Sequence, residues 1–268
     1  MNRRLLLAVC ALAFLGVLSG CLGIGTGPIP AEEIDSEPAE SYEWTNDRST
    51  RITIQENTKF RTIITVNDSS IQLFRNDGFG GTNPLSISAV RYRYPGGEII
   101  TGTEIRERGG EIRQTQAETI IELPSDAPDE TGKIAFTSGG SRKRFSLPTY
   151  ADGSYEIILP PNRRIDIPVF GTASPGGYET EIDTEDRLHL QWANIDESTE
   201  IVSVRFYLQR DLYVFGGIAA FVLLVGLGGL LRYRQQIQRL RAQRTEMGLE
   251  VETDDDDEFD DGPPPGMG

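Results

Sequence analysis

The chain has 268 residues and carries 41 Asp or Glu against 26 Lys or Arg, for a formal net charge of −15. This acidity argues against nucleic acid as a partner, because a phosphate backbone requires a basic surface. Only Lys59, Lys133 and Lys143 are lysines, which leaves 26 − 3 = 23 arginines. Abundant carboxylates with few lysines are typical of proteins kept soluble in strong salt, so we expect a halophilic source.

Residues 1–20 predict a secretory signal peptide, with two arginines before an apolar run that is short for a bilayer span. The motif Leu18-Ser19-Gly20-Cys21 is similar to the lipobox of bacterial and archaeal lipoproteins. This resemblance implies that Cys21 is the lipid acceptor; the alternative is a small residue of an ordinary signal peptide. Cys10 is the other cysteine of the chain, so the exported part is expected to have no disulfide and no thiol site.

Residues 21–43 are expected to form a lipid-anchored acidic linker, because positions 31–41 are rich in acids and poor in apolar residues. Residues 44–211 then change to short β-branched and aromatic runs separated by Gly, Asn, Asp and Pro. Apolar and polar residues alternate in Arg51–Gln55 and Arg187–Gln191, as in strands with one buried face. The region therefore predicts a mainly β fold, an antiparallel β-sandwich-like exported region.

Thirteen segments of this region are candidate strands: Arg51–Gln55, Phe60–Val66, Ile71–Arg75, Leu85–Tyr94, Glu98–Thr101, Thr119–Leu123, Lys133–Thr137, Arg142–Leu147, Ser154–Leu159, Arg164–Val169, Tyr178–Ile182, Arg187–Trp192 and Glu200–Gln209. No helix is expected there, since the best segment, Thr103–Gln116, is rich in Gly and Arg. A break in the rhythm near 148–153 leaves one domain and two sub-domains as alternatives.

Residues 212–231 contain no charge and predict one C-terminal transmembrane α-helix, because about 20 helical residues cross a bilayer core. Five arginines follow within 14 positions, whereas two lie just before, which places residues 22–211 outside the plasma membrane. Residues 232–268 would be cytoplasmic, a basic segment followed by a disordered acidic tail. Gly216 and Ala220 form a small-xxx-small pair that could support helix-mediated self-association.

Few residues suggest chemistry. The single histidine, His189, falls on the strand face opposite Leu188 and Leu190, where exposure to solvent is expected. With no second histidine and no cysteine in the exported part, no metal, cofactor or enzyme activity is predicted. The best cation-binding candidates are the acids of residues 126–130 and Asp183, Glu185 and Asp186, against the alternative of a solvated acidic turn. Asn67 begins an Asn-Asp-Ser glycan acceptor motif.

The whole chain resembles an uncharacterised family of haloarchaeal membrane lipoproteins. The resemblance is carried by the Leu-Ser-Gly-Cys box with residues 22–28, by Gly153–Glu156, Pro175–Thr180 and Tyr207–Leu212, and by Pro263–Met267. It implies the layout but no activity. We therefore expect a membrane-anchored cell-surface β module with a structural or interaction role, whose partners are membrane lipid and an unknown envelope protein. The alternative is a binding module for a small solute, ion or glycan.

Overall fold

The computed structural model describes residues 26–127, 132–196 and 198–248. Two compact units divide these residues, the first ending at Arg210 and the second beginning at Asp211. The predicted signal peptide, Cys21, residues 128–130 of one acidic candidate and the acidic tail from Glu250 lie outside the described residues.

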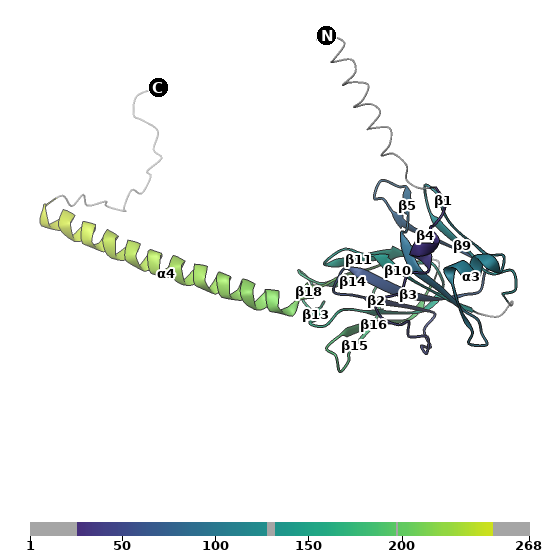
Figure 1. Cartoon of the computed structure of the whole chain (residues 1–268). Coiled ribbons are helices and arrows are strands. Elements are labelled where there is room, and N and C mark those ends of the chain that lie inside the picture. The colour runs from purple at the N-terminus through teal and green to yellow at the C-terminus, as the bar shows by residue number, and fades with distance from the viewer. Residues whose placement is uncertain (1–25, 128–131, 197, 249–268) are drawn as a thin grey trace, which may run out of the picture. The chain divides into compact units, whose positions relative to one another are not determined.

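The first unit is almost entirely β structure (Figure 1). Its largest sheet has the strand order β15 (Glu179–Ile182), β16 (Leu188–Ile195), β12 (Gly153–Ile158), β2 (Thr50–Ile54), β3 (Lys59–Val66), β10 (Gly132–Gly139), β6 (Ile87–Arg93) and β7 (Ile99–Thr101). A five-stranded sheet follows the order β1 (Gly27–Pro28), β8 (Glu111–Gln114), β9 (Thr119–Glu122), β4 (Ser70–Asn76) and β5 (Thr82–Pro84).

Two small sheets complete the unit: β11 (Arg144–Pro148), β17 (Ile201–Arg205) and β14 (Thr172–Ser174) in one, and β13 (Arg163–Arg164) with β18 (Tyr207–Leu208) in the other. The strands pair antiparallel, except that β12 runs parallel to β2. The predicted mainly β fold is confirmed. The strand predicted at Arg164–Val169 is wrong beyond Arg164, because Ile167–Phe170 is a turn closed by the Phe170 amide on the Ile167 carbonyl.

One hydrophobic core lies between the sheets. Ile64 and Phe136 of the large sheet, Leu73 and Ile121 of the five-stranded sheet and Val204 of β17 all belong to it and are fully covered. Because the same core continues past 148–153, that stretch is a connection between β11 and β12 inside one compact unit. Of the two alternatives, the described residues show a single domain.

The segment expected to be an exposed acidic spacer is folded. Residues Ala31–Ile34 form the helix α2, and the Ile34 side chain is fully buried in the core. A side chain at Gly102 would lie only 2.7 Å from Ile34 Cβ, so this position needs glycine for α2 to pack. Tyr42 is buried on the opposite face of the large sheet, against Ile63 and Ala135. Ile34 and Tyr42 are thus buried, which the expectation of an exposed linker did not include, while most of the acidic side chains between residues 31 and 43 are exposed.

Arginines attach this N-terminal segment to the sheets. The Arg61 guanidinium donates to the Ser41 carbonyl, and Arg93 donates to the Trp44 carbonyl. Arg91 reaches the carbonyls of residues 34, 35 and 36, and Arg106 reaches those of residues 29 and 112. One guanidinium can serve several carbonyls because it carries five N–H donors in a fixed fork.

A short helix, α3 (Gly102–Glu107), occurs where no helix was expected. Thr101 accepts from the Glu104 amide, and the Glu104 carboxylate accepts from the Thr101 amide, which is a capping box. The expectation is wrong because the capping box stabilises a helix of six residues, although the longer segment 103–116 is rich in Gly and Arg. Glu111–Gln114 of the same window is strand β8.

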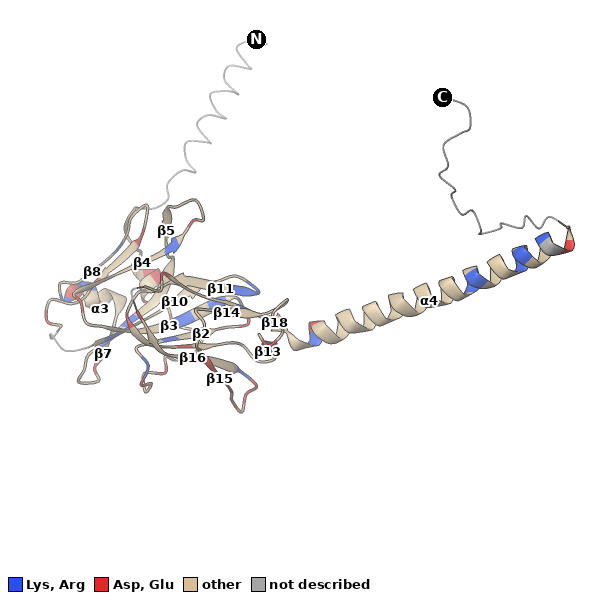
Figure 2. Ribbon diagram, turned by 180° about the vertical axis from the view of Figure 1, so that it is seen from behind, with Lys and Arg blue, Asp and Glu red and all other residues tan. Residues whose placement is uncertain are grey.

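The second unit contains most of helix α4 (Gln209–Glu246). The apolar part of α4 is not buried against the rest of the described chain, so by length and composition it is a candidate membrane span. Figure 2 shows that the ribbon of α4 has no charged residues in its middle and carries charged residues toward both ends. The predicted span of residues 212–231 lies within this helix, which starts three residues earlier and continues beyond it.

We predict that Ile34→Ala lowers the free energy of unfolding by about 2–5 kcal/mol, because it opens a cavity beside Gly102. Chemical denaturation of the full chain in detergent, followed by circular dichroism of the β signal, measures this change. Phe79→Ala is the control, since Phe79 is 98% exposed and its loss should change stability by less than about 0.5 kcal/mol. Equal effects of the two substitutions would contradict the buried position of Ile34.

Candidate functional site

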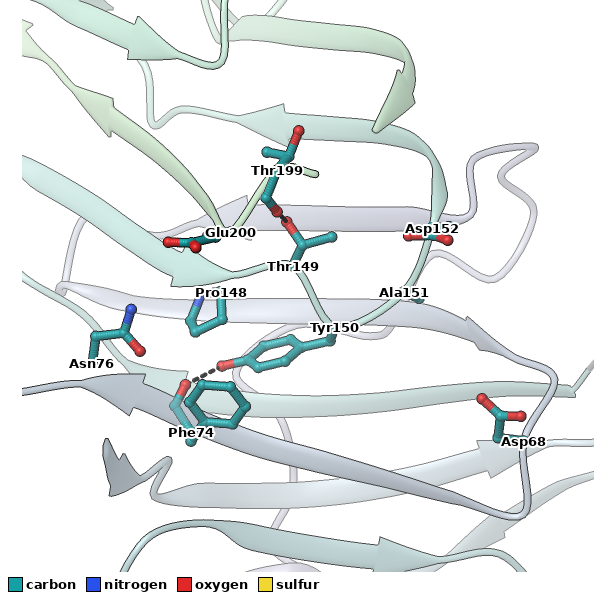
Figure 3. A pocket seen from close by; sticks show the side chains of 10 residues that line it. All are labelled: Asp68, Phe74, Asn76, Pro148, Thr149, Tyr150, Ala151, Asp152, Thr199 and Glu200. Atoms are coloured by element: carbon teal, nitrogen blue, oxygen red, sulfur yellow. Dashed lines mark hydrogen bonds between the residues drawn. The ribbon is translucent and has the colours of Figure 1, made fainter. Parts of the chain in front are cut away.

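A cleft of about 540 Å³ lies beside the connection between β11 and β12 (Figure 3). It is lined by Asp68, Phe74, Asn76, Pro148, Thr149, Tyr150, Ala151, Asp152, Thr199 and Glu200. In the view of Figure 3 the rings of Tyr150 and Phe74 lie between Asp152 and Asp68 toward one side and Glu200 and Asn76 toward the other. The cleft thus combines an aromatic centre with carboxylates on both sides.

Hydrogen bonds hold the cleft in shape. Tyr150 donates its hydroxyl to the Phe74 carbonyl at 2.6 Å, and its ring meets the Phe74 ring edge to face. Thr149 donates its hydroxyl to the Thr199 carbonyl at 2.6 Å. Burial raises the pKa of the Tyr150 hydroxyl, against the opposing charge of Arg75. The Tyr150 side chain is therefore neutral at ordinary pH and forms part of the cleft wall.

The predicted glycan acceptor lies next to this cleft. Asn67 is exposed in the turn between β3 and β4, as the motif requires. It lines a smaller hollow of about 210 Å³ that shares Asp68, Tyr150 and Asp152 with the cleft. A glycan on Asn67 would therefore stand at the rim of the cleft.

A second cluster, here called the His189 network, consists of Arg51, Glu156, Asp183, Arg187 and His189. Glu156 faces Arg51 across the β2–β12 pairing, and His189 lies one strand further on β16. The Arg51 Nε donates to Glu156 Oε2 at 2.6 Å. His189 Nδ1 lies 2.9 Å from Glu156 Oε1, and His189 Nε2 lies 3.2 Å from Asp183 Oδ2. Arg187 Nε then donates to Asp183 Oδ2 at 2.7 Å.

The network lies on the predicted face of β16, but it is not open to solvent. Glu156 is 3% exposed, and the His189 side chain is 16% exposed. The expectation of a solvent-facing His189 is wrong in this respect, because carboxylates from a neighbouring strand and from the β15–β16 turn cover both ring nitrogens.

The charges of the His189 network shift the pKa values of its members. Burial alone would raise the pKa of Glu156, but hydrogen bonds from His189 and Arg51 bring that pKa below its ordinary value. Burial likewise raises the pKa of Asp183, and hydrogen bonds from Arg187 and His189 lower it below its ordinary range. The hydrogen bond to Glu156 raises the pKa of His189, although burial opposes this shift. The arrangement favours two carboxylates held by a cationic imidazolium.

This geometry limits the chemistry of His189. A general base needs a ring nitrogen with a lone pair directed at a substrate proton. Here both nitrogens of His189 face carboxylate oxygens, so both act as donors in the imidazolium form. The arrangement therefore favours a structural cross-link between β12, β16 and the β15–β16 turn.

The three cation-binding candidates of that turn already face cationic side chains. Asp183 and Glu185 both contact Arg187, and Asp186 contacts Arg164. The Asp183 side chain also accepts from the backbone amides of residues 185 and 187, which closes the turn. Among the described residues, no group of three or more His, Cys, Asp or Glu side chains is arranged to hold a metal ion. These contacts favour the alternative of an acidic turn.

Sequence reasoning missed the cleft and the partners of His189. Asp152 and Glu200 are 48 positions apart, and Glu156 and His189 are 33 apart, so neither pairing follows from spacing. One usable signal was Glu156 itself, a lone acid between Tyr155 and Ile157 of β12. A charged residue in such a place requires a cationic partner on a neighbouring strand.

We predict that His189 stabilises the fold in a pH-dependent way. Because its pKa is raised in the folded state, this contribution is fully present below the ordinary value of 6.5 and is lost as the pH rises through the raised pKa. The lowered pKa values of Glu156 and Asp183 act oppositely, since their contribution is lost only in acid. The difference in melting temperature between the wild type and His189→Gln should therefore be largest near about pH 6 and shrink toward about pH 9.

Ala193→Gln is the matched control for this experiment. It adds the same amide side chain at an exposed position of β16 without removing a titrating group. Its difference from the wild type should not depend on pH. A constant difference for His189→Gln would contradict the assignment of a cationic His189.

Comparison with known proteins adds a family but no activity. A search of curated proteins finds no match. The model of DUF5803, a family of unknown function, matches residues 46–252. This range is more than half of the chain and contains both the strands from β2 onward and all of helix α4. The chain therefore belongs to the DUF5803 family.

Proposed function

We propose that this protein is a membrane-anchored module whose β unit faces the outside of the cell and acts there by non-covalent interaction with an envelope component. The observation that carries the proposal is helix α4. Its uncharged stretch of residues 212–231 would be about 30 Å long, which equals the hydrocarbon thickness of a bilayer. A fully exposed apolar helix of this length is stable in lipid and not in water.

The sidedness of the proposal is supported by the arginines of α4. One arginine of α4, Arg210, precedes the uncharged stretch. Five arginines follow it, at positions 232, 234, 239, 241 and 244. Basic residues next to a span remain on the cytoplasmic side. We therefore place the β unit outside and the C-terminal end inside, at the plasma membrane.

The N-terminal part of the proposal rests on sequence alone. The Leu18-Ser19-Gly20-Cys21 box supports export and lipid attachment at Cys21, and the acidic, lysine-poor composition supports a halophilic source. Together they support a doubly anchored lipoprotein of the haloarchaeal type. Self-association through Gly216 and Ala220 is a further part of this proposal. These residues are one helical turn apart and exposed on α4.

We expect a cysteine at Thr184, exposed in the β15–β16 turn, to react with a membrane-impermeant maleimide on intact cells. A cysteine at Ala242, exposed near the end of α4, should react only after permeabilisation. The parental chain is the background control, because its only cysteines are Cys10 and Cys21. The reverse labelling pattern, or labelling of both variants on intact cells, would contradict the proposal.

The cleft of Figure 3 favours a second candidate function, the binding of a small cationic or polyhydroxylated solute. Asp68, Asp152 and Glu200 surround it with negative charge, and Tyr150 and Phe74 supply aromatic edges for apolar ligand groups. Pockets with a few convergent polar groups around an apolar centre are common ligand sites. The cleft volume of about 540 Å³ lies in the usual range for such sites.

If this second function holds, spermidine should raise the melting temperature of the protein at constant ionic strength. A ligand present at a hundred times its Kd stabilises a protein by about 2.7 kcal/mol. The double substitution Asp152→Asn with Glu200→Gln should remove this stabilisation. Glu179→Gln with Glu181→Gln, which removes the same charge from exposed positions of β15, should leave it unchanged. Equal loss in both double variants would indicate a non-specific charge effect.

A further inference from the structure

Strand β18, which leads into α4, forms hydrogen bonds with residues 162–164 of the β unit. Strand β18, Tyr207–Leu208, pairs with β13, and the Gln209 amide donates to the Asn162 carbonyl at 3.1 Å. The uncharged stretch begins at Leu212, four residues after Leu208, so at most about 14 Å of chain separates them. Whatever packs on β18 must therefore lie close to the membrane surface, provided that α4 spans the membrane as proposed.

An apolar patch lies at this edge, here called the 168–182 patch and defined as Pro168, Val169, Phe170 and Ile182. Val169 is 76% exposed, Ile182 is 53% exposed and Phe170 is 37% exposed. Within the described part of the first unit, only two other large hydrophobic side chains are exposed to this degree, Phe79 and Ile99. The Phe170 ring packs edge to face on the Tyr207 ring at 6.0 Å, which joins the patch directly to β18.

Apolar, aromatic and charged side chains surround the patch. A hollow of about 740 Å³ beside it is lined by apolar side chains, including Ile165, Ile182 and Leu188, and by the polar side chains of Arg164, Asp166, Thr172 and Thr180. The Arg205 guanidinium donates to the Pro168 carbonyl at 3.3 Å and so holds a positive charge next to the loop. Arg163 pairs with Leu208 in the β13–β18 ladder and adds a second basic residue. Exposed apolar residues flanked by arginines and aromatic rings are typical of segments that enter the headgroup region.

We propose that the 168–182 patch inserts into the headgroup region of the outer leaflet, as a second membrane contact of the β unit beside the span. The chain itself argues for lipid as the occupant, because the patch packs on the strand that continues into the membrane helix. The arginines at its border match anionic headgroups. A second copy of the chain or a protein partner could bind a patch anywhere on the β unit and would not require one next to β18. The experiment below distinguishes these occupants from lipid.

The test uses tryptophan substitutions in the full chain reconstituted into vesicles with and without brominated phospholipid. Val169→Trp should emit at shorter wavelength than a water-exposed tryptophan and lose emission in brominated vesicles. Val222→Trp, in the middle of α4, is the control for the span and should be quenched as well. Phe79→Trp, on the β4–β5 connection, is the control for an exposed site and should not be quenched. Emission of the native Trp44 and Trp192 is subtracted with the parental protein.

The outcomes separate the two proposals. Quenching of Val222→Trp without quenching of Val169→Trp would overturn the inserted patch but retain the span. Absence of quenching in both would overturn the span and with it the proposed function. A blue-shifted Val169→Trp that bromine does not quench would mean that protein covers the patch, and this result also overturns the proposal.

Discussion

The antiparallel pair β3–β10 is the constraint on which the rest of the fold depends. Eight consecutive residue pairs join the two strands, from Gly132 opposite Val66 to Gly139 opposite Lys59. Both faces of the pair are covered: Ile64 and Phe136 face the main core, and Ile63 and Ala135 lie under Tyr42. Five consecutive residues of β3, from Phe60 to Ile64, are therefore buried, and Arg61 and Thr62 are buried among its apolar side chains.

The N-terminal segment covers the face of Ile63 and Ala135 through Tyr42, and arginines attach this segment to the large sheet. Arg61, Arg91 and Arg93 project from the large sheet and donate to carbonyls of residues 34–44. A lysine carries a single ammonium with three donors and cannot serve several carbonyls in a fixed planar geometry. The ratio of 23 arginines to three lysines therefore has a local structural reason in addition to the solvent effect proposed for salt-rich surroundings.

The sequence predicted those parts of the structure that depend on local pattern. Alternation located β2 and β16, and the lack of charge located the apolar part of α4. Prediction failed where one or two residues determine the local structure although the composition of the segment around them favours a different one. Ile34 is one apolar residue among acids, yet its burial turns a predicted spacer into part of the core. In α3 the Thr101 and Glu104 capping pair outweighs the unfavourable composition around it.

The candidate sites could not be predicted, because strand order determines them. Glu156 meets Arg51 only because β12 joins β2 in parallel, and a parallel pair of strands distant in sequence carries no local signal. The cleft likewise depends on the connection at residues 148–152 lying beside the end of β4. From the sequence, Glu156 is a lone acid between Tyr155 and Ile157, and its burial follows from the order of the strands.

Strand β1 is only two residues long, yet it determines how the N-terminal end of the unit can be held. Gly27 and Pro28 pair with Gln114 and Arg113 of β8, and Gly27 lies six positions after Cys21 in the sequence. Six residues reach at most about 21 Å. If Cys21 carries lipid, this short segment attaches β1, at the edge of the five-stranded sheet, to the membrane. Strand β18 leads into helix α4, which is the second proposed attachment. A module attached at one point can rotate about that point, whereas two attachments at separate edges restrict its orientation. The positions of β1 and β18 in the fold would then determine which face of the β unit is accessible to a partner.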